Sequence, residues 1–336
     1  MLKKINKIVL WLMIVLFVAL IGIYFGQQAF NRNSFKINYE KFNNCKGSYN
    51  FINPEVACLF SSDEKYLERN EHLESKVRGL VNYSIKSGKA TNVSVFIRDL
   101  VAKQWIGIDE NINFAPASLL KLPLLIAYYK LSEIEPMVLL EKHIYNGPTK
   151  INNEAQRIKP KETLELGKEY TTEELLFRMI VYSDNNALSI LSDSINNDFL
   201  NDVFIDLGIY IPTSSNVETK FLSSKIYGNM LRALFNSNYL EPSNSDKILE
   251  LLTKTTFDDG LRSNIPKEIK IAHKFGERQA TGGGNNIVTE NLYDCGIVYY
   301  TENPYILCIM TQGFDLNNLR EVIKNISQTV YEEFSN

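Results

Sequence analysis

Ser118 and Lys121 are three residues apart in a strongly apolar stretch, residues 114–130, and Pro116 can begin a helix there. On a helix this spacing places both side chains on one face, one turn apart. A lysine in a water-poor pocket can lose its proton and then accept the proton of a serine nucleophile. The alternative is an ordinary core helix whose lysine extends its amine to the surface.

A second polar group, Ser183-Asp184-Asn185, interrupts two apolar helical runs. In one interpretation it is a loop between helices, and its serine and aspartate cap the second helix. In the other, Ser183 passes a proton to a leaving group and Asn185 holds a substrate amide. Both interpretations stay open on these residues alone.

The elements that would position these residues follow from hydrophobic periodicity and turn signals. Helices are predicted at residues 63–86, from 116 onward, and at 137–141, 171–182, 199–207, 223–235, 245–252 and 316–334. Strands are predicted at residues 92–100, 104–108, 269–277, 292–300 and 305–311. Thr171 and Glu174 form a capping box that begins one of the helices.

This order of elements predicts an α+β fold. A five-stranded antiparallel sheet is flanked by the N- and C-terminal helices, and an all-helical lobe at about residues 110–260 lies beside it. Residues 145–170 are polar and rich in turn residues, and we expect them at the edge of this lobe.

Taken in order, Ser118-x-x-Lys121, Ser183-Asp184-Asn185 and Lys274-Phe275-Gly276 resemble the motifs of class A β-lactamases and penicillin-binding proteins. The resemblance covers about residues 70–336 and includes the runs PASLLKLP and MIVYSDNNA around the first two motifs. It implies the β-lactamase/transpeptidase fold and an acyl-enzyme mechanism without a cofactor.

The resemblance also implies roles for the catalytic residues. Ser118 would be the acylated nucleophile, Lys121 its proton acceptor and Ser183 the proton carrier, while Lys274 would supply positive charge. Two nearby lysines would lower each other's pKa.

Substrate contacts are implied for Asn185, Phe275, Gly276 and Glu277. Asn185 would organise the site with Lys121, and Gly276 would let the acyl group lie along the strand. The backbone N–H groups of Ser118 and Glu277 would form the oxyanion hole.

Two departures from the family pattern bear on the activity. Phe275 stands where the family usually has threonine or serine, whose hydroxyl helps to hold a substrate carboxylate. The Glu-x-x-Leu-Asn pattern that drives deacylation in class A enzymes does not follow the second motif; Glu218 is the only acid between Asp206 and Glu241. Loss of a positioned base typically costs ~10² to 10⁴ in rate, enough to make an acyl-enzyme long-lived.

Three functions are therefore predicted as alternatives. The first is a serine hydrolase related to class A β-lactamases that cleaves a β-lactam or a related amide through Ser118. The second is a D-Ala-D-Ala carboxypeptidase or transpeptidase acting on peptidoglycan peptides. The third is a non-catalytic binding module on the same scaffold, which the three intact motifs disfavour.

The N-terminal segment predicts a membrane anchor. Lys3, Lys4 and Lys7 precede residues 8–25, eighteen residues without a charge, which is about the length of a membrane-spanning helix. The positive flank favours a single-pass protein whose C-terminal domain is extracytoplasmic. A cleaved signal peptide is the alternative. The predicted division is an anchor at 1–26, a spacer at 27–62 and a catalytic domain at 63–336.

Composition and charge limit the partners. The chain has 336 residues, 45% of them hydrophobic, and carries 36 basic and 39 acidic residues, which argues against a nucleic-acid partner. Only three histidines are present, without metal-ligand spacing, so no zinc site is predicted. Cys45 and Cys58 could pair, whereas Cys295 and Cys308 are expected to be buried and reduced. A monomer is expected.

Overall fold

The computed structural model describes residues 49–53, 71–102, 104–149, 151–154, 156–213, 219–282, 287–300 and 303–335. All of them fall in one compact unit, Ser48–Asn336. The predicted anchor at residues 8–25, the domain boundaries at 26 and 62, Cys45, Cys58 and Glu218 lie outside the described residues. Within this described part, no helix has both the length and the apolar character that a membrane span needs.

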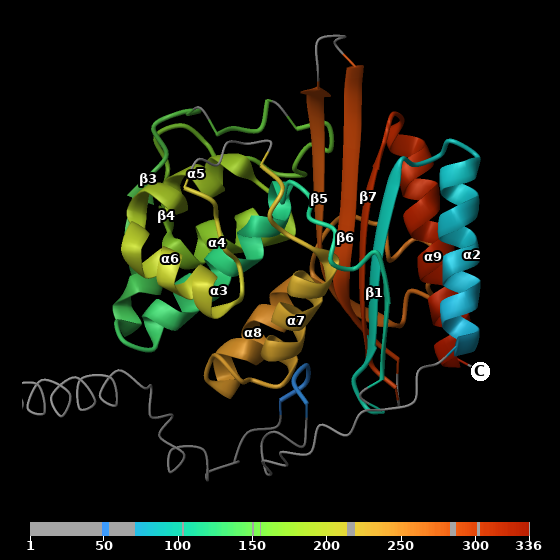
Figure 1. Cartoon of the computed structure of the whole chain (residues 1–336). Coiled ribbons are helices and arrows are strands. Elements are labelled where there is room, and N and C mark those ends of the chain that lie inside the picture. The colour runs from blue at the N-terminus through green and yellow to red at the C-terminus, as the bar shows by residue number, and fades with distance from the viewer. Residues whose placement is uncertain are drawn as a thin grey trace, which may run out of the picture. The chain divides into compact units, whose positions relative to one another are not determined.

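Five antiparallel strands form the main sheet in the order β2-β1-β7-β6-β5 (Figure 1). Their bounds are β1 (Asn92–Asp99), β2 (Trp105–Ile108), β5 (Lys270–Gly282), β6 (Ile287–Tyr299) and β7 (Tyr305–Gly313). The predicted five-stranded antiparallel sheet is confirmed. The β5–β6 hairpin extends beyond the predicted strands, to Gly282 and Ile287. The prediction stopped short because the outer part of the hairpin is polar and lacks the apolar alternation of the inner part.

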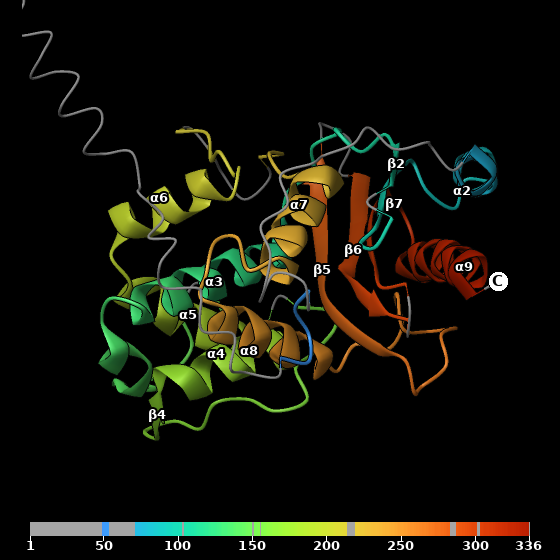
Figure 2. The same cartoon turned by 90° about the horizontal axis from the view of Figure 1, so that it is seen from below.

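Two helices cover one face of the sheet. They are α2 (Glu71–Lys86) and α9 (Leu316–Ser335), and they lie side by side (Figure 2). The buried residues of α9 recur every three or four positions, which gives the helix one apolar side toward the sheet. β7 is buried at eight of its nine positions, because the helical lobe covers its other face.

The prediction of an all-helical lobe is wrong in one respect. In the described part of the chain the lobe consists of α-helices, two 3-10 helices and a short two-stranded ladder, which two three-residue segments form by pairing across a long loop. The α-helices are α3 (Lys121–Ser132), α4 (Thr172–Val181), α5 (Asn185–Ser194), α6 (Asn197–Asp206), α7 (Ser224–Phe235) and α8 (Pro242–Thr253). The other elements are η2 (Ala117–Leu120), η3 (Pro136–Leu140), β3 (Lys142–Ile144) and β4 (Glu169–Thr171). The predicted capping box is present, with Thr171 and Glu174 each bonded to the other's backbone N–H.

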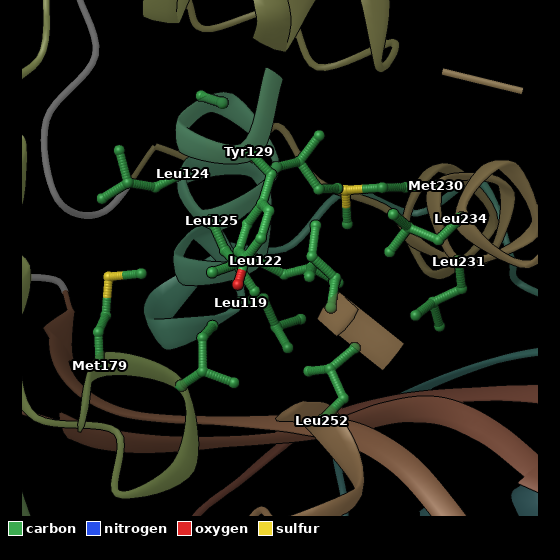
Figure 3. Close-up of a cluster of buried hydrophobic side chains, with 14 of the residues drawn as sticks. Leu119, Leu122, Leu124, Leu125, Tyr129, Met179, Met230, Leu231, Leu234 and Leu252 are labelled. Atoms are coloured by element: carbon green, nitrogen blue, oxygen red, sulfur yellow. The ribbon is translucent and has the colours of Figure 1, made fainter. Parts of the chain in front are cut away.

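α3 is the central helix of the lobe. Every residue from Lys121 to Tyr129 is buried, so the helix has no solvent-facing side in this part. Leucine side chains of α3 meet side chains from α4, α7 and α8, among them Met179, Met230 and Leu252 (Figure 3). A helix packed on all sides cannot shift without opening cavities, so its first turn has a fixed position.

Cys295 and Cys308 form a disulfide between β6 and β7. Both are fully buried, as predicted, but the expectation that they are reduced is wrong. The register of the sheet places the two residues directly opposite each other. Strand pairing brings the two Cα atoms to 3.9 Å, and the spacing of 13 residues along the chain does not reveal this register.

Candidate active site

Ser118 lies in the 3-10 turn η2, which runs directly into α3. The sequence predicted an α-helix from Pro116, so the type of helix differs here. A 3-10 helix has three residues per turn, and Ser118 and Lys121 therefore still lie on the same side. Ala117, which precedes the serine, has a φ of 49°, a left-handed conformation that is uncommon for a residue with a Cβ atom.

The surroundings of η2 hold this turn in place. The backbone N–H of Phe114 donates to the carbonyl of Leu222 at 2.8 Å, which ties the segment before the turn to the segment before α7. On the other side, the turn continues into the buried helix α3. The strained conformation at Ala117 is therefore supported by packing from both directions.

Lys121 is the first residue of α3 and only 1% exposed. Its Nζ donates to the carbonyl oxygen of Ser183 at 2.6 Å and to the Ser183 hydroxyl at 3.1 Å. The amine therefore does not extend to the surface. The alternative of an ordinary core helix, whose lysine reaches solvent, does not hold here. It connects the first motif to the second.

Ser183 lies between α4 and α5 and is completely buried. Its φ is 57°, a second left-handed non-glycine residue at the site. Its carbonyl accepts hydrogen bonds from Lys121 and from the side-chain amide of Gln156, the latter at 2.9 Å. Asp184 caps α5 by accepting from the backbone N–H of Asn186 and Ala187, so the capping interpretation of this motif is correct for the aspartate.

Lys274 reaches the same hydroxyl from the sheet. It lies on β5, is fully buried, and donates from Nζ to the Ser183 Oγ at 3.0 Å. A second bond runs to the carbonyl oxygen of Phe275 at 2.9 Å. The hydroxyl of Ser183 thus lies within hydrogen-bond distance of two amines that come from different parts of the chain.

Burial changes the proton affinity of both amines. The pKa of Lys121 is lowered well below its usual value, mainly because burial removes water from the ammonium and also because Lys274 is close. Burial lowers the pKa of Lys274 to about 7, against an opposing effect from Asp294. A neutral Lys121 can accept a proton, which is the state that a general base requires.

Gly276 allows β5 to approach the turn that carries Ser118. A Cβ atom at this glycine would lie 3.3 Å from the backbone nitrogen of Leu119 and 3.4 Å from that of Ser118. The strand and the N-terminal end of η2 therefore lie in contact. Backbone N–H groups at such a junction can stabilise a developing oxyanion, and the assignment of this role to Ser118 and Glu277 stays a prediction.

Comparison with known proteins identifies the family. The sequence model of the Beta-lactamase enzyme family (Beta-lactamase2) matches residues 72–334, which include all three motifs. The chain belongs to this family. Among the curated proteins, no sequence matches it at a significant level.

Solved structures of the β-lactamase type share the fold. A mutant of PBP-A, captured as an acyl-enzyme with penicillin G, is 22% identical with a TM-score of 0.65, covering 80% of this chain and 98% of its own. A β-lactamase from Sphaerobacter thermophilus is 19% identical with a TM-score of 0.64, covering 77% and 96%. The TLA-1 extended-spectrum β-lactamase is 17% identical with a TM-score of 0.65, covering 80% and 100%.

Phe275, predicted to contact the substrate, is only 3% exposed in this β-lactamase family member. Its ring stacks on Phe257 at 4.3 Å between centroids, and the Nζ of Lys274 lies 4.2 Å from its centre. The ring therefore borders the site through Lys274. Its contact with a substrate stays a prediction.

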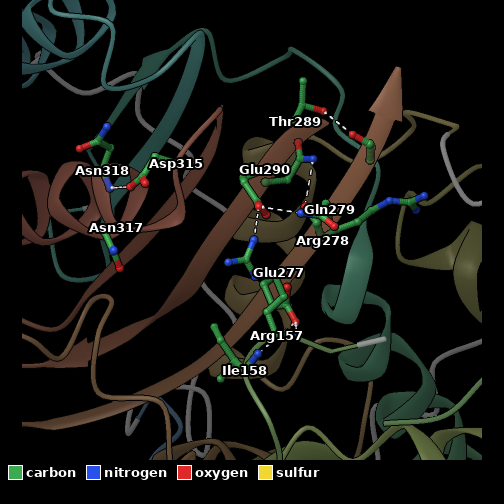
Figure 4. A network of polar contacts seen from close by, with 12 residues as sticks. Arg157, Ile158, Glu277, Arg278, Gln279, Thr289, Glu290, Asp315, Asn317 and Asn318 are labelled. Atoms are coloured by element: carbon green, nitrogen blue, oxygen red, sulfur yellow. Dashed lines mark hydrogen bonds and ion pairs between the residues drawn. The ribbon is translucent and has the colours of Figure 1, made fainter. Parts of the chain in front are cut away.

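Glu277 connects the sheet to a loop that the sequence analysis assigned to the edge of the lobe. Its carboxylate accepts the backbone N–H of Arg157 at 2.8 Å and that of Ile158 at 3.4 Å. The Arg157 guanidinium pairs with Glu290 on β6, which also accepts from Gln279 (Figure 4). We call residues 152–154 and 156–158 the bridging loop.

The other end of the bridging loop contacts the second motif. The side-chain amide of Asn185 donates to the carbonyl of Asn152 at 3.0 Å, and its backbone N–H donates to the side chain of Asn153 at 2.7 Å. Asn153 also donates to Asp184 at 2.9 Å. The predicted substrate-binding amide of Asn185 is thus bonded to the loop in this structure.

Several of these residues were missed by sequence reasoning. The bridging loop gave no signal, because polar residues in a turn-rich stretch indicate only a surface loop. The buried pair of His273 and Asp294, with 2.8 Å between Nδ1 and Oδ1, was also missed. His273 is the neighbour of Lys274 in sequence, but only strand pairing places Asp294 beside it.

Proposed function

We propose that this protein is a serine hydrolase that opens amides of the β-lactam type through an acyl-enzyme on Ser118. The observation that supports it best is the Ser183 hydroxyl, which lies 3.1 Å from the amine of Lys121 and 3.0 Å from that of Lys274. Lys121 is in turn one 3-10 turn from Ser118. A buried amine with a lowered pKa, next to a serine and a second hydroxyl, is suited to proton transfer at an acyl group.

The chemical steps follow from this arrangement. Neutral Lys121 takes the proton of the Ser118 hydroxyl while Oγ forms a bond to the carbonyl carbon. The C–N bond then breaks, and the nitrogen receives a proton through Ser183. Water later cleaves the ester, which releases the acid and restores Ser118.

The two enzymatic alternatives differ in how fast water cleaves the acyl-enzyme ester. The segment after the second motif lacks the Glu-x-x-Leu-Asn pattern of class A enzymes. An acyl-enzyme without a positioned base is slower to hydrolyse by ~10² to 10⁴. This absence from the sequence supports a peptidoglycan peptidase or a slow hydrolase as the second candidate, in which a β-lactam remains attached as a long-lived ester.

We also propose that residues 8–25 anchor the protein in the cell membrane with the catalytic domain outside. The support is the uncharged run of eighteen residues behind three lysines. Fractionation of cells that express the full chain tests this. Recovery of intact protein in the membrane fraction after an alkaline wash is expected, and recovery of a shortened protein in the medium would contradict it.

The acyl-enzyme is tested by intact mass spectrometry of the full-length protein in detergent. Incubation with penicillin G or a fluorophosphonate should give one covalent adduct, and Ser118→Ala should give none. The lifetime of the penicillin adduct then distinguishes a hydrolase from a protein that stays acylated. Labelling that persists in Ser118→Ala would exclude this serine as the nucleophile.

A further inference from the structure

When Lys274 is protonated, each of its three N–H donors has a partner from its own chain. It donates to the Ser183 hydroxyl at 3.0 Å and to the Phe275 carbonyl at 2.9 Å, and its Nζ lies 4.2 Å from the centre of the Phe275 ring. An ammonium carries three N–H donors, and the face of an aromatic ring attracts a cation. The two hydrogen bonds and the ring account for all three.

The Phe275 ring is held firmly against Lys274. It stacks on Phe257 with an interplanar angle of 25°, and these two residues are 3% and 5% exposed. Both belong to the apolar cluster that includes Leu261 and Ile265. Because protein interiors are close-packed, the ring cannot rotate away from the ammonium without opening a cavity.

On the face of β5 that carries Phe275, the neighbouring charged groups do not attract an anion. Glu277 keeps its carboxylate on the backbone N–H groups of the bridging loop. Arg157, the cation on that loop, pairs with Glu290 (Figure 4). Arg278 lies on the opposite face, together with Lys274, because side chains alternate along a strand. Its buried Nε has no hydrogen-bond partner among the described residues, so the test must exclude it as a carboxylate site.

We propose that Phe275 frees this site from dependence on a substrate carboxylate. Neutral amides and esters would then react with Ser118 as readily as their carboxylate-bearing counterparts. A carboxylate could bind Lys274 only by displacing either the ring or the hydroxyl of Ser183, which carries the proton in the proposed reaction. The inference rests on the proposed acylation of Ser118 and defines the substrate class more narrowly.

The test compares penicillin G with its methyl ester on the full-length protein, because the two differ only at the carboxylate. Adduct formation is followed by intact mass spectrometry. A charged hydrogen bond contributes ~1.5–3 kcal/mol, so a site that used the carboxylate would favour the acid by about tenfold to more than a hundredfold. We expect the two rate constants to agree within about threefold, and a preference for the acid of about tenfold or more would overturn the proposal.

Three variants sharpen the comparison. Phe275→Thr removes the ring and adds a hydroxyl, so it should raise the preference for the acid to about tenfold. Phe257→Leu removes the stacking partner that holds the Phe275 ring, so it should shift the preference in the same direction but by less. If wild type favours the acid and Arg278→Met removes that preference, Arg278 holds the carboxylate and the proposal is wrong. Should Phe275→Thr fail to fold, the wild-type ratio still decides.

A fluorophosphonate, which lacks a carboxylate, separates the two proposals. Labelling of Ser118 by this probe together with a strong preference for penicillin acid would refute the inference and leave the acyl-enzyme in place. No labelling by the fluorophosphonate or by either penicillin would refute both.

Discussion

The hydroxyl of Ser183 lies 3.0 Å from the amine of Lys274, although 91 residues separate them in the chain. The same hydroxyl lies 3.1 Å from the amine of Lys121, 62 residues earlier. The first residue of α3, an interhelix loop and the edge strand β5 therefore converge on one point. Because Ser183 contacts both amines, it is the group through which protons can pass between them.

Lys121→Met should separate catalysis from stability. We expect acylation of Ser118 by penicillin G to slow by ~10² to 10⁴, because the neutral amine that accepts the serine proton is lost. The folded protein should be no less stable at pH 7, since burial lowers the pKa of Lys121 and keeping its amine neutral at this pH costs free energy that a methionine does not. Stopped-flow or mass-spectrometric acylation rates and urea unfolding provide the two measurements, with the exposed Lys254→Met as the control.

Gly276→Ala should reduce acylation with little change in the free energy of unfolding. The added Cβ atom would lie 3.3–3.4 Å from two backbone nitrogens of η2, so either the strand or the turn must move by a few tenths of an ångström. A displacement at the reacting centre is costly for catalysis. We expect at least a tenfold lower acylation rate.

Gly79→Ala is the matched control for that variant. Gly79 lies in α2, and no atom comes within 4 Å of a Cβ placed there. Alanine in a helix interior is favoured over glycine by roughly 0.5–1 kcal/mol, so this variant should be slightly more stable and equally reactive. An equal loss of acylation in the two variants would contradict a local effect at η2.

Stability should rise with pH above neutrality because of the two buried lysines. Between about pH 7 and pH 9.5 the unfolded chain keeps Lys274 protonated, whereas the folded chain has lost the proton through its pKa of about 7. Unfolding therefore takes up protons in this range, and the free energy of unfolding increases with pH. Lys121, whose pKa burial also lowers, acts in the same direction.

Urea unfolding at several pH values tests this, with Lys274→Met as the comparison. The wild-type midpoint should increase between pH 7 and pH 9.5, and the increase should be smaller in the variant. Buried tyrosines with raised pKa values, such as Tyr227, oppose the trend only where tyrosines of the unfolded chain ionise, near pH 10. The same slope in both proteins would mean that Lys274 is protonated in the folded state.

Removal of the disulfide by a Cys295→Ala/Cys308→Ala double substitution should lower the free energy of unfolding. Closing a loop of this length contributes about 3 kcal/mol in the chain-entropy model, and the two residues are 13 positions apart. Urea unfolding with and without a reductant provides the measurement. If the reductant shifts the wild-type midpoint no further than that of the double variant, the two cysteines are not bonded in solution.

The sequence alone determined the motifs and most of the elements, but not the β3–β4 ladder. Alternation of apolar residues predicted all five strands, and the Thr171–Glu174 capping box located the start of α4. These are local patterns, because secondary structure depends on periodicity and on residues a few positions apart. The motif order then indicated the family and named Lys121, Ser183 and Lys274, although it gave no distances.

Only the tertiary structure decided which distant residues meet. The register of β6 and β7 places Cys295 opposite Cys308, where the two form a disulfide. The fold also brings Glu277 to the bridging loop and places Phe275 between Phe257 and Lys274. The local pattern of apolar and polar residues predicts none of these contacts. They arise because close packing admits only one arrangement of the strands and helices, and that arrangement places residues together irrespective of their separation in the chain.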